Sequence, residues 1–298
     1  MNSKSLLKAG VCLFAVATLF LGCAKEELDV SYIYLPAFEI LPSATSGDIT
    51  TQITDVRVVL GAESLGFYPL PARIPILGSG SQLVRLEPVV RVAGLASNRI
   101  VYPFYEVFEE TLNLVPGTID TITPQLNYRS SVSFAYVEDF EGSDPSFPLN
   151  LDDFTETEFV RSTANVRSGS GSGMATVTED ASVLEVATPV LNTNGQTWNR
   201  IWLEMDFYRD ESAITVAVLP ETPETDETRL FRYEQGGNKK NEGESGRWIK
   251  LYFELVDNGI REFATEPFRI GFLSALDQTD TSTTADIVID NIKVVYQN

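Results

Sequence analysis

Short apolar runs separated by Gly and Pro are the feature that most constrains the fold. Runs such as residues 56–60, 74–77 and 89–92 recur roughly every ten residues from Tyr32 onward. No apolar stripe with a 3.6-residue period lies between them, so few helices are expected. Short strands bounded by turn signals at this spacing are typical of β-sandwiches. The sequence therefore predicts an all-β fold.

The composition changes near residues 129 and 130, which divides the chain into two predicted sandwiches. Residues 31–129 form the first. Its segment 66–88 runs strand, Leu-Gly, aromatic, Pro, strand, Gly-rich turn, strand. This order resembles immunoglobulin-like and carboxypeptidase-regulatory-like modules. An immunoglobulin-like β-sandwich that acts as a spacer is therefore expected here.

Residues 130–298 are richer in acids and have longer polar loops. The segment 134–142 opens this part, and 286–296 closes it. A first strand that pairs with the last is how a jelly roll closes. Four segments in this order resemble the galactose-binding-like jelly rolls of carbohydrate-binding modules: residues 138–141, 202–208, 248–252 and 289–292. The resemblance implies a jelly-roll sandwich that binds carbohydrate.

The N-terminus has the parts of an export signal. Lys4 and Lys8 precede an apolar run from Ala9 to Leu21. This run is too short to cross a bilayer, for which a helix needs about 20 residues. It ends in Phe20-Leu21-Gly22-Cys23, which resembles the lipobox of bacterial lipoproteins. The resemblance implies a signal peptide over 1–22 and diacylglycerol plus acyl chains, such as palmitate, on Cys23. An ordinary signal peptide cleaved elsewhere is the alternative.

Residues 23–30 form an acidic tether behind the anchor. The tether contains Lys25-Glu26-Glu27 directly after Ala24. A Lys followed by two acids at this position resembles the export tag of Bacteroidota-type surface lipoproteins. The resemblance implies an outer-membrane protein that faces the cell exterior. The alternative is a tether whose charges only keep it solvated.

Net charge limits the partners. The chain has 22 basic and 42 acidic residues and no histidine, which gives a formal charge of −20. Two basic residues and no acid lie in the signal segment, so the mature chain is still more negative. Such a charge repels phosphate backbones and excludes nucleic acid as a natural partner. It also leaves the attachment to the membrane to the acyl chains.

Catalytic groups are scarce. Without histidine, Ser-His-Asp and Cys-His systems are excluded, and Cys12 leaves with the signal while Cys23 is acylated. The run 168–173 alternates Ser and Gly but lacks the Lys of a phosphate-binding loop, so a flexible turn is expected. Glu204 and Asp206 share a strand face, as in some glycosidases, but Tyr208 and Arg209 stand where a third carboxylate is needed. A non-catalytic protein is favoured over a hydrolase.

The alternation of two strands predicts a ligand-binding face. Ile201, Leu203, Met205 and Phe207 are apolar and face the core, so the residues between them face outward. Aromatic rings stack on sugar C–H faces while charged side chains bind hydroxyls. The predicted glycan-binding residues are Trp202, Glu204, Asp206, Tyr208, Lys250 and Tyr252. The alternative is that loops or the first domain cover this face, which makes the aromatics ordinary packing.

Jelly rolls of this type often contain a structural calcium ion, which prefers carboxylate and carbonyl oxygens. The resemblance places its ligands at Asp139, Glu141 and Asp290. Alternatively, Asp290 accepts backbone hydrogen bonds. Together these features predict a cell-surface lipoprotein that binds polysaccharide. The alternatives are an accessory subunit of an outer-membrane transport, secretion or adhesion complex with a β-barrel partner, and, less favoured, a glycoside hydrolase.

Overall fold

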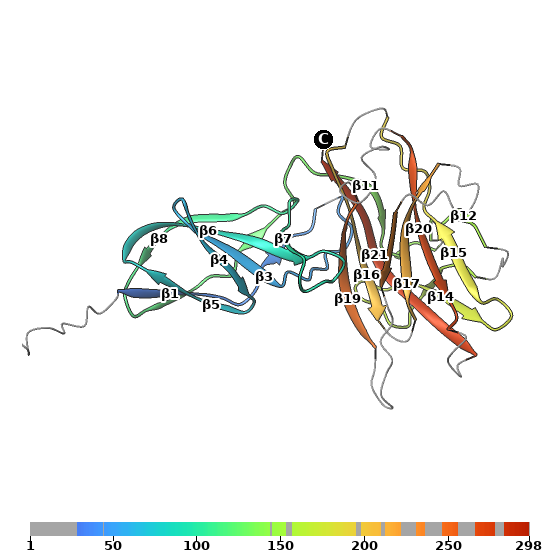
Figure 1. Cartoon of the computed structure of the whole chain (residues 1–298), viewed down its shortest axis with the longest axis horizontal. Helices are drawn as coiled ribbons and strands as arrows, with labels where there is room; N and C mark the ends of the chain where they lie inside the picture. Colours follow the sequence, from blue (N-terminus) through green and yellow to red (C-terminus); the bar gives the residue numbers. More distant parts are fainter. Residues whose placement is uncertain are drawn as a thin grey trace, which may run out of the picture.

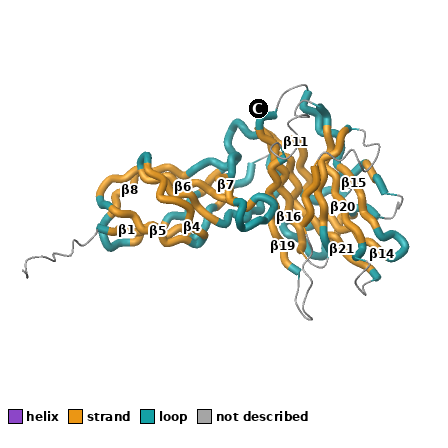
Figure 2. Tube along the Cα trace, viewed as in Figure 1, coloured by secondary structure: helices purple, strands orange, loops and turns teal. Residues whose placement is uncertain are grey.

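The computed structural model describes most of the chain after the tether. It describes residues 29–298 except 44, 144, 153–156, 195–197, 210–211, 222–230, 236–245, 256–265, 278–282 and 298. The predicted signal peptide, Cys23 and most of the tether lie outside the described residues. Within the described part there are strands and loops but no helix (Figure 2). No helix long and apolar enough to span a membrane is found there. The prediction of an all-β fold is confirmed.

Ten strands make up an N-terminal sandwich and eleven make up a C-terminal sandwich. The N-terminal strands are β1 (Val30–Leu35), β2 (Glu39–Ile40), β3 (Asp55–Leu60), β4 (Glu63–Pro69), β5 (Ala72–Leu77), β6 (Gly80–Arg91), β7 (Arg99–Val101), β8 (Phe108–Leu114), β9 (Ile119–Thr121) and β10 (Gln125–Leu126). The C-terminal strands are β11 (Ser133–Glu138), β12 (Leu149–Asn150), β13 (Val160–Ser162), β14 (Ser172–Thr178), β15 (Val183–Ala187), β16 (Arg200–Arg209), β17 (Ile214–Pro220), β18 (Phe231–Gln235), β19 (Arg247–Glu254), β20 (Phe268–Ala275) and β21 (Thr284–Gln297).

The N-terminal sandwich packs a small sheet against a larger one. The small sheet has the order β5-β1-β9, and the larger one has the order β4-β3-β6-β7, with β8 also paired to β6. Alternate residues of β1 and β5, including Ile33 and Ile74, are fully buried against Val58 and Leu86 of the larger sheet. This alternation follows from the two-residue period of a strand with one face on a core. The immunoglobulin-like topology stays a prediction.

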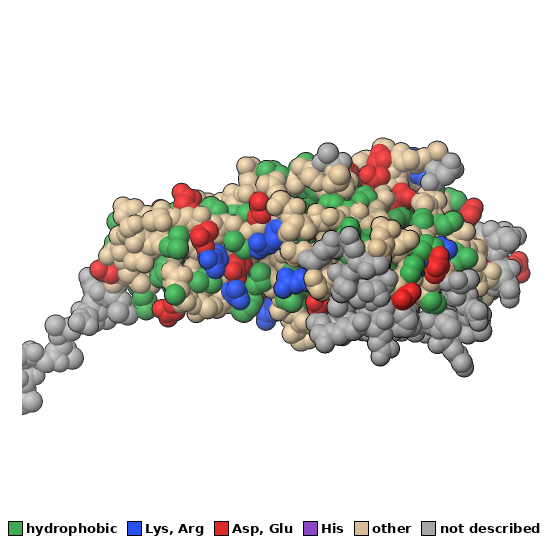
Figure 3. All heavy atoms as spheres, turned by 90° about the horizontal axis from the view of Figure 1, so that it is seen from above, with side chains coloured by type: hydrophobic (Ala, Val, Ile, Leu, Met, Phe, Trp, Pro, Cys, Tyr) green, Lys and Arg blue, Asp and Glu red, His purple; other side chains and the backbone are tan. Residues whose placement is uncertain are grey.

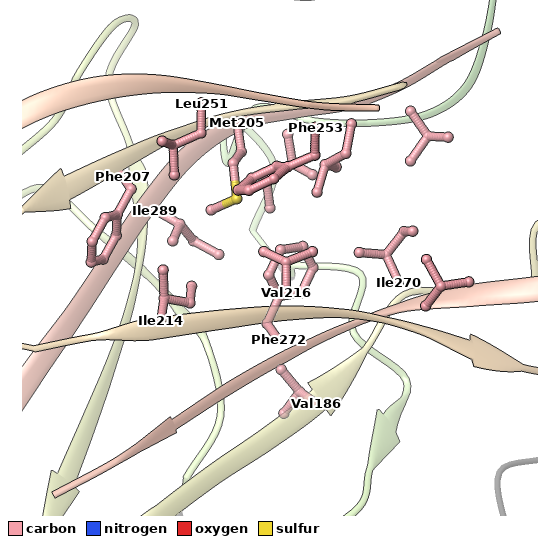
Figure 4. Packing of buried hydrophobic residues seen from close by; sticks show 14 of the residues in the cluster. Val186, Met205, Phe207, Ile214, Val216, Leu251, Phe253, Ile270, Phe272 and Ile289 are labelled. Atoms are coloured by element: carbon pink, nitrogen blue, oxygen red, sulfur yellow. The ribbon is translucent and has the colours of Figure 1, made fainter. Parts of the chain in front are cut away.

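The C-terminal sandwich packs two long sheets face to face. One has the order β13-β14-β21-β16-β19, with β11 also paired to β21, and the other has the order β12-β15-β20-β17-β18. In Figure 4, side chains such as Met205 and Leu251 from the first sheet point toward Val216 and Phe272 from the second. The predicted core face of residues 201–207 is confirmed, since all four apolar residues are buried in this cluster.

The opening and closing strands of the C-terminal sandwich pair as predicted. β11 runs antiparallel to β21, with Ser133 opposite Tyr296 and Glu138 opposite Ile292. The molecule is elongated, and the two sandwiches lie end to end (Figure 1). β1 begins at the end of the N-terminal sandwich that is far from the C-terminal sandwich. The near end of the N-terminal sandwich meets the sheet that contains β16, β19 and β21.

Candidate functional site

The predicted glycan-binding face is buried. Trp202, Glu204 and Asp206 of β16 have no exposed surface. On the neighbouring strand β19, Lys250 and Tyr252 are also buried. Only Tyr208, near the end of β16, keeps part of its surface exposed. As the alternation predicted, these side chains point away from the core of the C-terminal sandwich. They are nevertheless not exposed to solvent.

The N-terminal sandwich covers this face with aromatic side chains. Trp202 and Tyr252 belong to the same buried cluster as Tyr102 and Phe104, which follow β7. The Tyr102 ring lies 5.3 Å from the Trp202 ring and 5.1 Å from the Tyr252 ring, edge to face in both cases. Such edge-to-face pairs favour association beyond the apolar area that they bury. The aromatic side chains of this face therefore form an interface between the two sandwiches.

Glu204 is held by hydroxyl groups from the N-terminal sandwich. Its carboxylate accepts hydrogen bonds from the hydroxyls of Tyr102 and Tyr128, the latter at 2.9 and 3.0 Å. Hydrogen bonds from neutral donors stabilise a buried carboxylate that would otherwise lose its hydration at high cost. This carboxylate therefore contributes to the contact between the sandwiches.

Asp206 and Lys250 form the charged centre of the same interface. The Lys250 ammonium lies 3.5 Å from the Asp206 carboxylate and 3.8 Å from that of Glu204. Thr50, in the segment before β3, donates to Asp206 and accepts from Lys250 at 3.1 Å. Gln52 accepts from the backbone N–H of Lys250 at 2.8 Å. Segment 50–52 thus hydrogen-bonds to Asp206 and Lys250 of the C-terminal sandwich.

These contacts correct the prediction that this face binds glycan. The alternative, that the first domain covers it, describes the structure: Trp202, Glu204, Asp206, Lys250 and Tyr252 hold the two sandwiches together and are closed to a polysaccharide chain. Glu204 and Asp206, the carboxylates considered for hydrolysis, are closed to substrate for the same reason. The sequence pattern of a strand does not indicate which surface of the C-terminal sandwich the N-terminal sandwich packs against.

One aromatic pair lies beyond the covered area. Tyr208 is directly opposite Trp248 in the register of β16 and β19. Their rings lie 5.5 Å apart, and both side chains are partly exposed. The backbone of Gly246 packs on the Tyr208 ring so closely that a Cβ there would lie 2.6 Å from it. On the same strand, two residues before Tyr208, Asp206 lies 3.6 Å from the Arg167 guanidinium.

The Tyr208–Trp248 pair is the candidate binding site. It presents two partly exposed rings on neighbouring strands, and such rings are suited to stacking on a sugar ring. Tyr208 was among the predicted site residues, but Trp248 was not. The signal that points to Trp248 is its place in the same alternation as Lys250 and Tyr252.

The predicted calcium ligands do not fit a metal site. The described residues contain no group of three or more acidic, His or Cys side chains placed to hold a metal ion. Glu141 accepts from the backbone N–H groups of Ser170 and Gly171 at 2.7 and 3.1 Å, while a side-chain oxygen of Asp139 accepts from the N–H of Glu141 itself. Carboxylates directed at N–H donors are poorly placed to bind a cation.

Asp290 accepts backbone hydrogen bonds, as the alternative to calcium binding predicted. Its donors are the N–H groups of Arg167, Ser168 and Asn291, at 3.1, 3.4 and 2.8 Å. Burial nevertheless raises the pKa of the Asp290 carboxyl to about 7, because desolvation outweighs these bonds. On the same strand, burial lowers the pKa of the Lys293 ammonium to about 8. Lys293 donates to the carbonyl of Asp48 in the N-terminal sandwich, whereas Asp290 is bonded within the C-terminal sandwich.

No protein-family model matches the chain, and no curated protein matches it. Several solved structures are similar to the chain at low sequence identity. One, from a study of the promiscuous specificity of carbohydrate-binding modules of the β-sandwich superfamily, is 16% identical with a TM-score of 0.38, over 81% of this chain and 84% of its own. The xylan-binding domain CBM22-1 of Xyn10C from Paenibacillus barcinonensis is 12% identical with a TM-score of 0.34, over 57% and 98%.

An adhesin domain resembles the chain to a similar degree. The K3 cleaved adhesin domain of Lys-gingipain from Porphyromonas gingivalis is 12% identical with a TM-score of 0.38, over 54% of this chain and 98% of its own.

Proposed function

We propose that this chain is a lipid-anchored, non-catalytic protein of the cell surface that binds polysaccharide through its C-terminal sandwich. The observation that carries the binding proposal is the partly exposed Tyr208–Trp248 pair. Arg167, which pairs with Asp206 two residues before Tyr208, would supply a guanidinium group. Rings of this kind stack on the C–H faces of sugars, and the guanidinium donates hydrogen bonds to hydroxyls. No metal or cofactor is needed for such binding.

The elongated arrangement supports the surface role. β1 begins at one end of the molecule, and the C-terminal sandwich occupies the other. With Cys23 acylated, the N-terminal sandwich would stand between the membrane and the binding domain. The buried interface between the sandwiches resists bending at their junction, because bending would expose Trp202 and break the hydrogen bonds that Glu204 and Asp206 accept from the N-terminal sandwich. The N-terminal sandwich is in this proposal a rigid spacer.

Retention on polysaccharide affinity gels tests the binding site. Wild-type protein is expected to be retarded on at least one gel from a panel of plant and bacterial polysaccharides. Tyr208→Ala and Trp248→Ala are each expected to remove most of this retardation, because each deletes a stacking surface worth about 1 kcal/mol or more. The measurement is the relative mobility of native protein in gels with and without polysaccharide.

Phe67→Ala provides the matched control. Phe67 is 49% exposed on β4 of the N-terminal sandwich, away from the pair. Its removal should leave the retardation unchanged. Unchanged retardation in Tyr208→Ala and Trp248→Ala would contradict the proposed site, while an absence of retardation for the wild type on every gel would contradict polysaccharide binding.

An accessory role in an outer-membrane complex is the second candidate. It is favoured by exposed apolar side chains on the N-terminal sandwich, which include Leu77 and Ile119, away from the Tyr208–Trp248 pair. Patches of this kind often mark protein contacts. Extraction in mild detergent would then recover the chain together with a membrane partner, and the affinity gels would show no retardation.

A further inference from the structure

The outer face of the small N-terminal sheet is apolar and exposed. In β5-β1-β9, the residues that alternate with the buried ones form neighbouring rows across the three strands. Leu77 lies opposite Val30, and Pro75 lies opposite Tyr32, which in turn lies beside Ile119. Leu77 is 66% exposed and Ile119 is 49% exposed. Facing residues on adjacent strands lie about 5 Å apart, so these side chains form one continuous surface. We call it the β1 face.

The β1 face changes in character along the strand. The row at the start of β1 contains only Leu77 and Val30. The second row contains the Tyr32 ring, and the third contains Arg73, Tyr34 and Thr121. The Arg73 guanidinium lies 4.0 Å from the centre of the Tyr32 ring, where it makes a cation–π contact. The order from the start of β1 is therefore aliphatic, then aromatic, then cationic.

The most apolar row lies where the tether joins the sandwich. The N–H of Gly78, after β5, donates to the carbonyl of Asp29 at 2.9 Å, and the N–H of Gly117, before β9, donates to that of Val30 at 2.8 Å. The hairpin after Leu77 and the turn before Ile119 therefore flank the first residues of β1. Figure 3 shows hydrophobic side chains on the surface toward this end.

The length of the tether decides what this face can reach. Six residues separate Cys23 from Val30. A fully extended chain spans at most about 3.5 Å per residue, so Val30 lies within roughly 20 to 25 Å of the acylated residue. If the chain is anchored through Cys23, the first row of the β1 face therefore stays within this distance of the lipid headgroups.

We propose that the end of the β1 face nearest the tether enters the bilayer interface and fixes the orientation of the protein on the membrane; this inference rests on the proposed lipid anchor at Cys23. Aliphatic side chains nearest the anchor enter the interface, Tyr32 and Tyr34 sit at headgroup depth, and Arg73 pairs with lipid phosphate. The acidic net charge repels anionic lipid, so the contact depends on apolar burial. The same charge disfavours a second copy of the chain on this face.

Quenching by brominated lipid tests this contact. The acylated protein is reconstituted into vesicles of phosphatidylcholine with brominated acyl chains, and tryptophan emission is compared with that in unbrominated vesicles. Leu77→Trp is expected to lose its added emission in brominated vesicles, and Ile119→Trp serves as a second probe in case the first variant misfolds. Leu95→Trp is the matched control: Leu95 is 55% exposed on the N-terminal sandwich but lies in the turn after Val92, which bridges to Tyr252. Its added emission should not change.

The outcomes separate the inference from the proposal on which it rests. Flotation of the wild type with vesicles, lost in Cys23→Ala, supports the anchor by itself. Flotation with no extra quenching at positions 77 and 119 overturns the membrane contact and leaves the anchor standing. A second result would also overturn the membrane contact: no quenching in vesicles, together with protection of Leu77→Cys from a water-soluble maleimide in native outer membranes. In that case a protein partner covers the face. Absence of flotation overturns both.

Discussion

At the scale of single residues, the buried charges explain why the predicted binding face is closed. Lys250 is inserted between Glu204 and Asp206, and each carboxylate also accepts hydroxyl hydrogen bonds from the N-terminal sandwich. A charge moves from water to a protein interior only where partners replace its hydration. These side chains are chemically those of a carbohydrate site, but they are buried, and both carboxylates and the ammonium group already have partners within the protein.

Asp290 gives a prediction for the pH dependence of stability. Its pKa of about 7 in the folded protein exceeds the ordinary value of 3.8. Between about pH 4 and pH 7 the folded state therefore retains a proton that the unfolded state releases. This group thus lowers the free energy of unfolding as pH rises through that window. Asp290→Asn cannot ionise, so urea unfolding should show a smaller fall in stability between pH 4 and pH 7 than in the wild type.

Asp286→Asn is the control for this experiment. Asp286 is on the same strand, β21, but exposed. Its replacement should leave the slope of stability against pH between pH 4 and pH 7 close to that of the wild type. If Asp290→Asn retains the full wild-type slope, a different group is responsible for it.

At the scale of elements, the Ser-Gly run is a close-packed segment and not the flexible turn that the sequence suggests. The N–H groups of Ser168, Ser170 and Gly171 point at the carboxylates of Asp290 and Glu141. A Cβ at Gly171 would lie 2.4 Å from the Phe140 carbonyl oxygen. Glycine is present because a backbone must approach this closely, a requirement that composition alone does not distinguish from flexibility.

Gly171→Ala should therefore destabilise the C-terminal sandwich by about 1–3 kcal/mol, because its methyl group overlaps backbone that cannot move away cheaply. Gly142→Ala is the matched control, since nothing lies within 4 Å of a Cβ there. Its effect should stay within about 0.5 kcal/mol. The free energy of unfolding in urea measures both. Equal stabilities for the two variants would show that segment 168–173 yields to the added methyl group.

At the scale of the whole molecule, the interface between the sandwiches should make them unfold together. Lys250→Met removes the cation between Glu204 and Asp206 and leaves two buried carboxylates without it. Breaking a buried ion pair in this way typically costs about 3–5 kcal/mol. We expect that loss in urea unfolding, together with a separation of the single transition into two, as followed by tryptophan fluorescence.

Arg85→Met is the control for this prediction. Its pairing with Glu109 is on the surface, where both side chains are about 40% exposed. Exposed pairs contribute about 1 kcal/mol or less, so this variant should retain one transition and nearly the wild-type stability. A comparable loss in both variants would mean that the buried charges do not couple the sandwiches.

The sequence by itself determined the all-β architecture, the core face of residues 201–207 and the pairing of the opening and closing strands. The first two follow from side-chain periodicity, which is a local property: a strand with one buried face must alternate. The strand pairing was expected from the way in which a jelly roll closes. Only the tertiary structure decided that the outward face of β16 and β19 is an interface and that Tyr208 and Trp248 remain accessible. Periodicity predicts which side chains point away from a sheet's own core. The surface that covers them comes from residues such as Thr50 and Tyr102, at least 102 positions away from their hydrogen-bond partners.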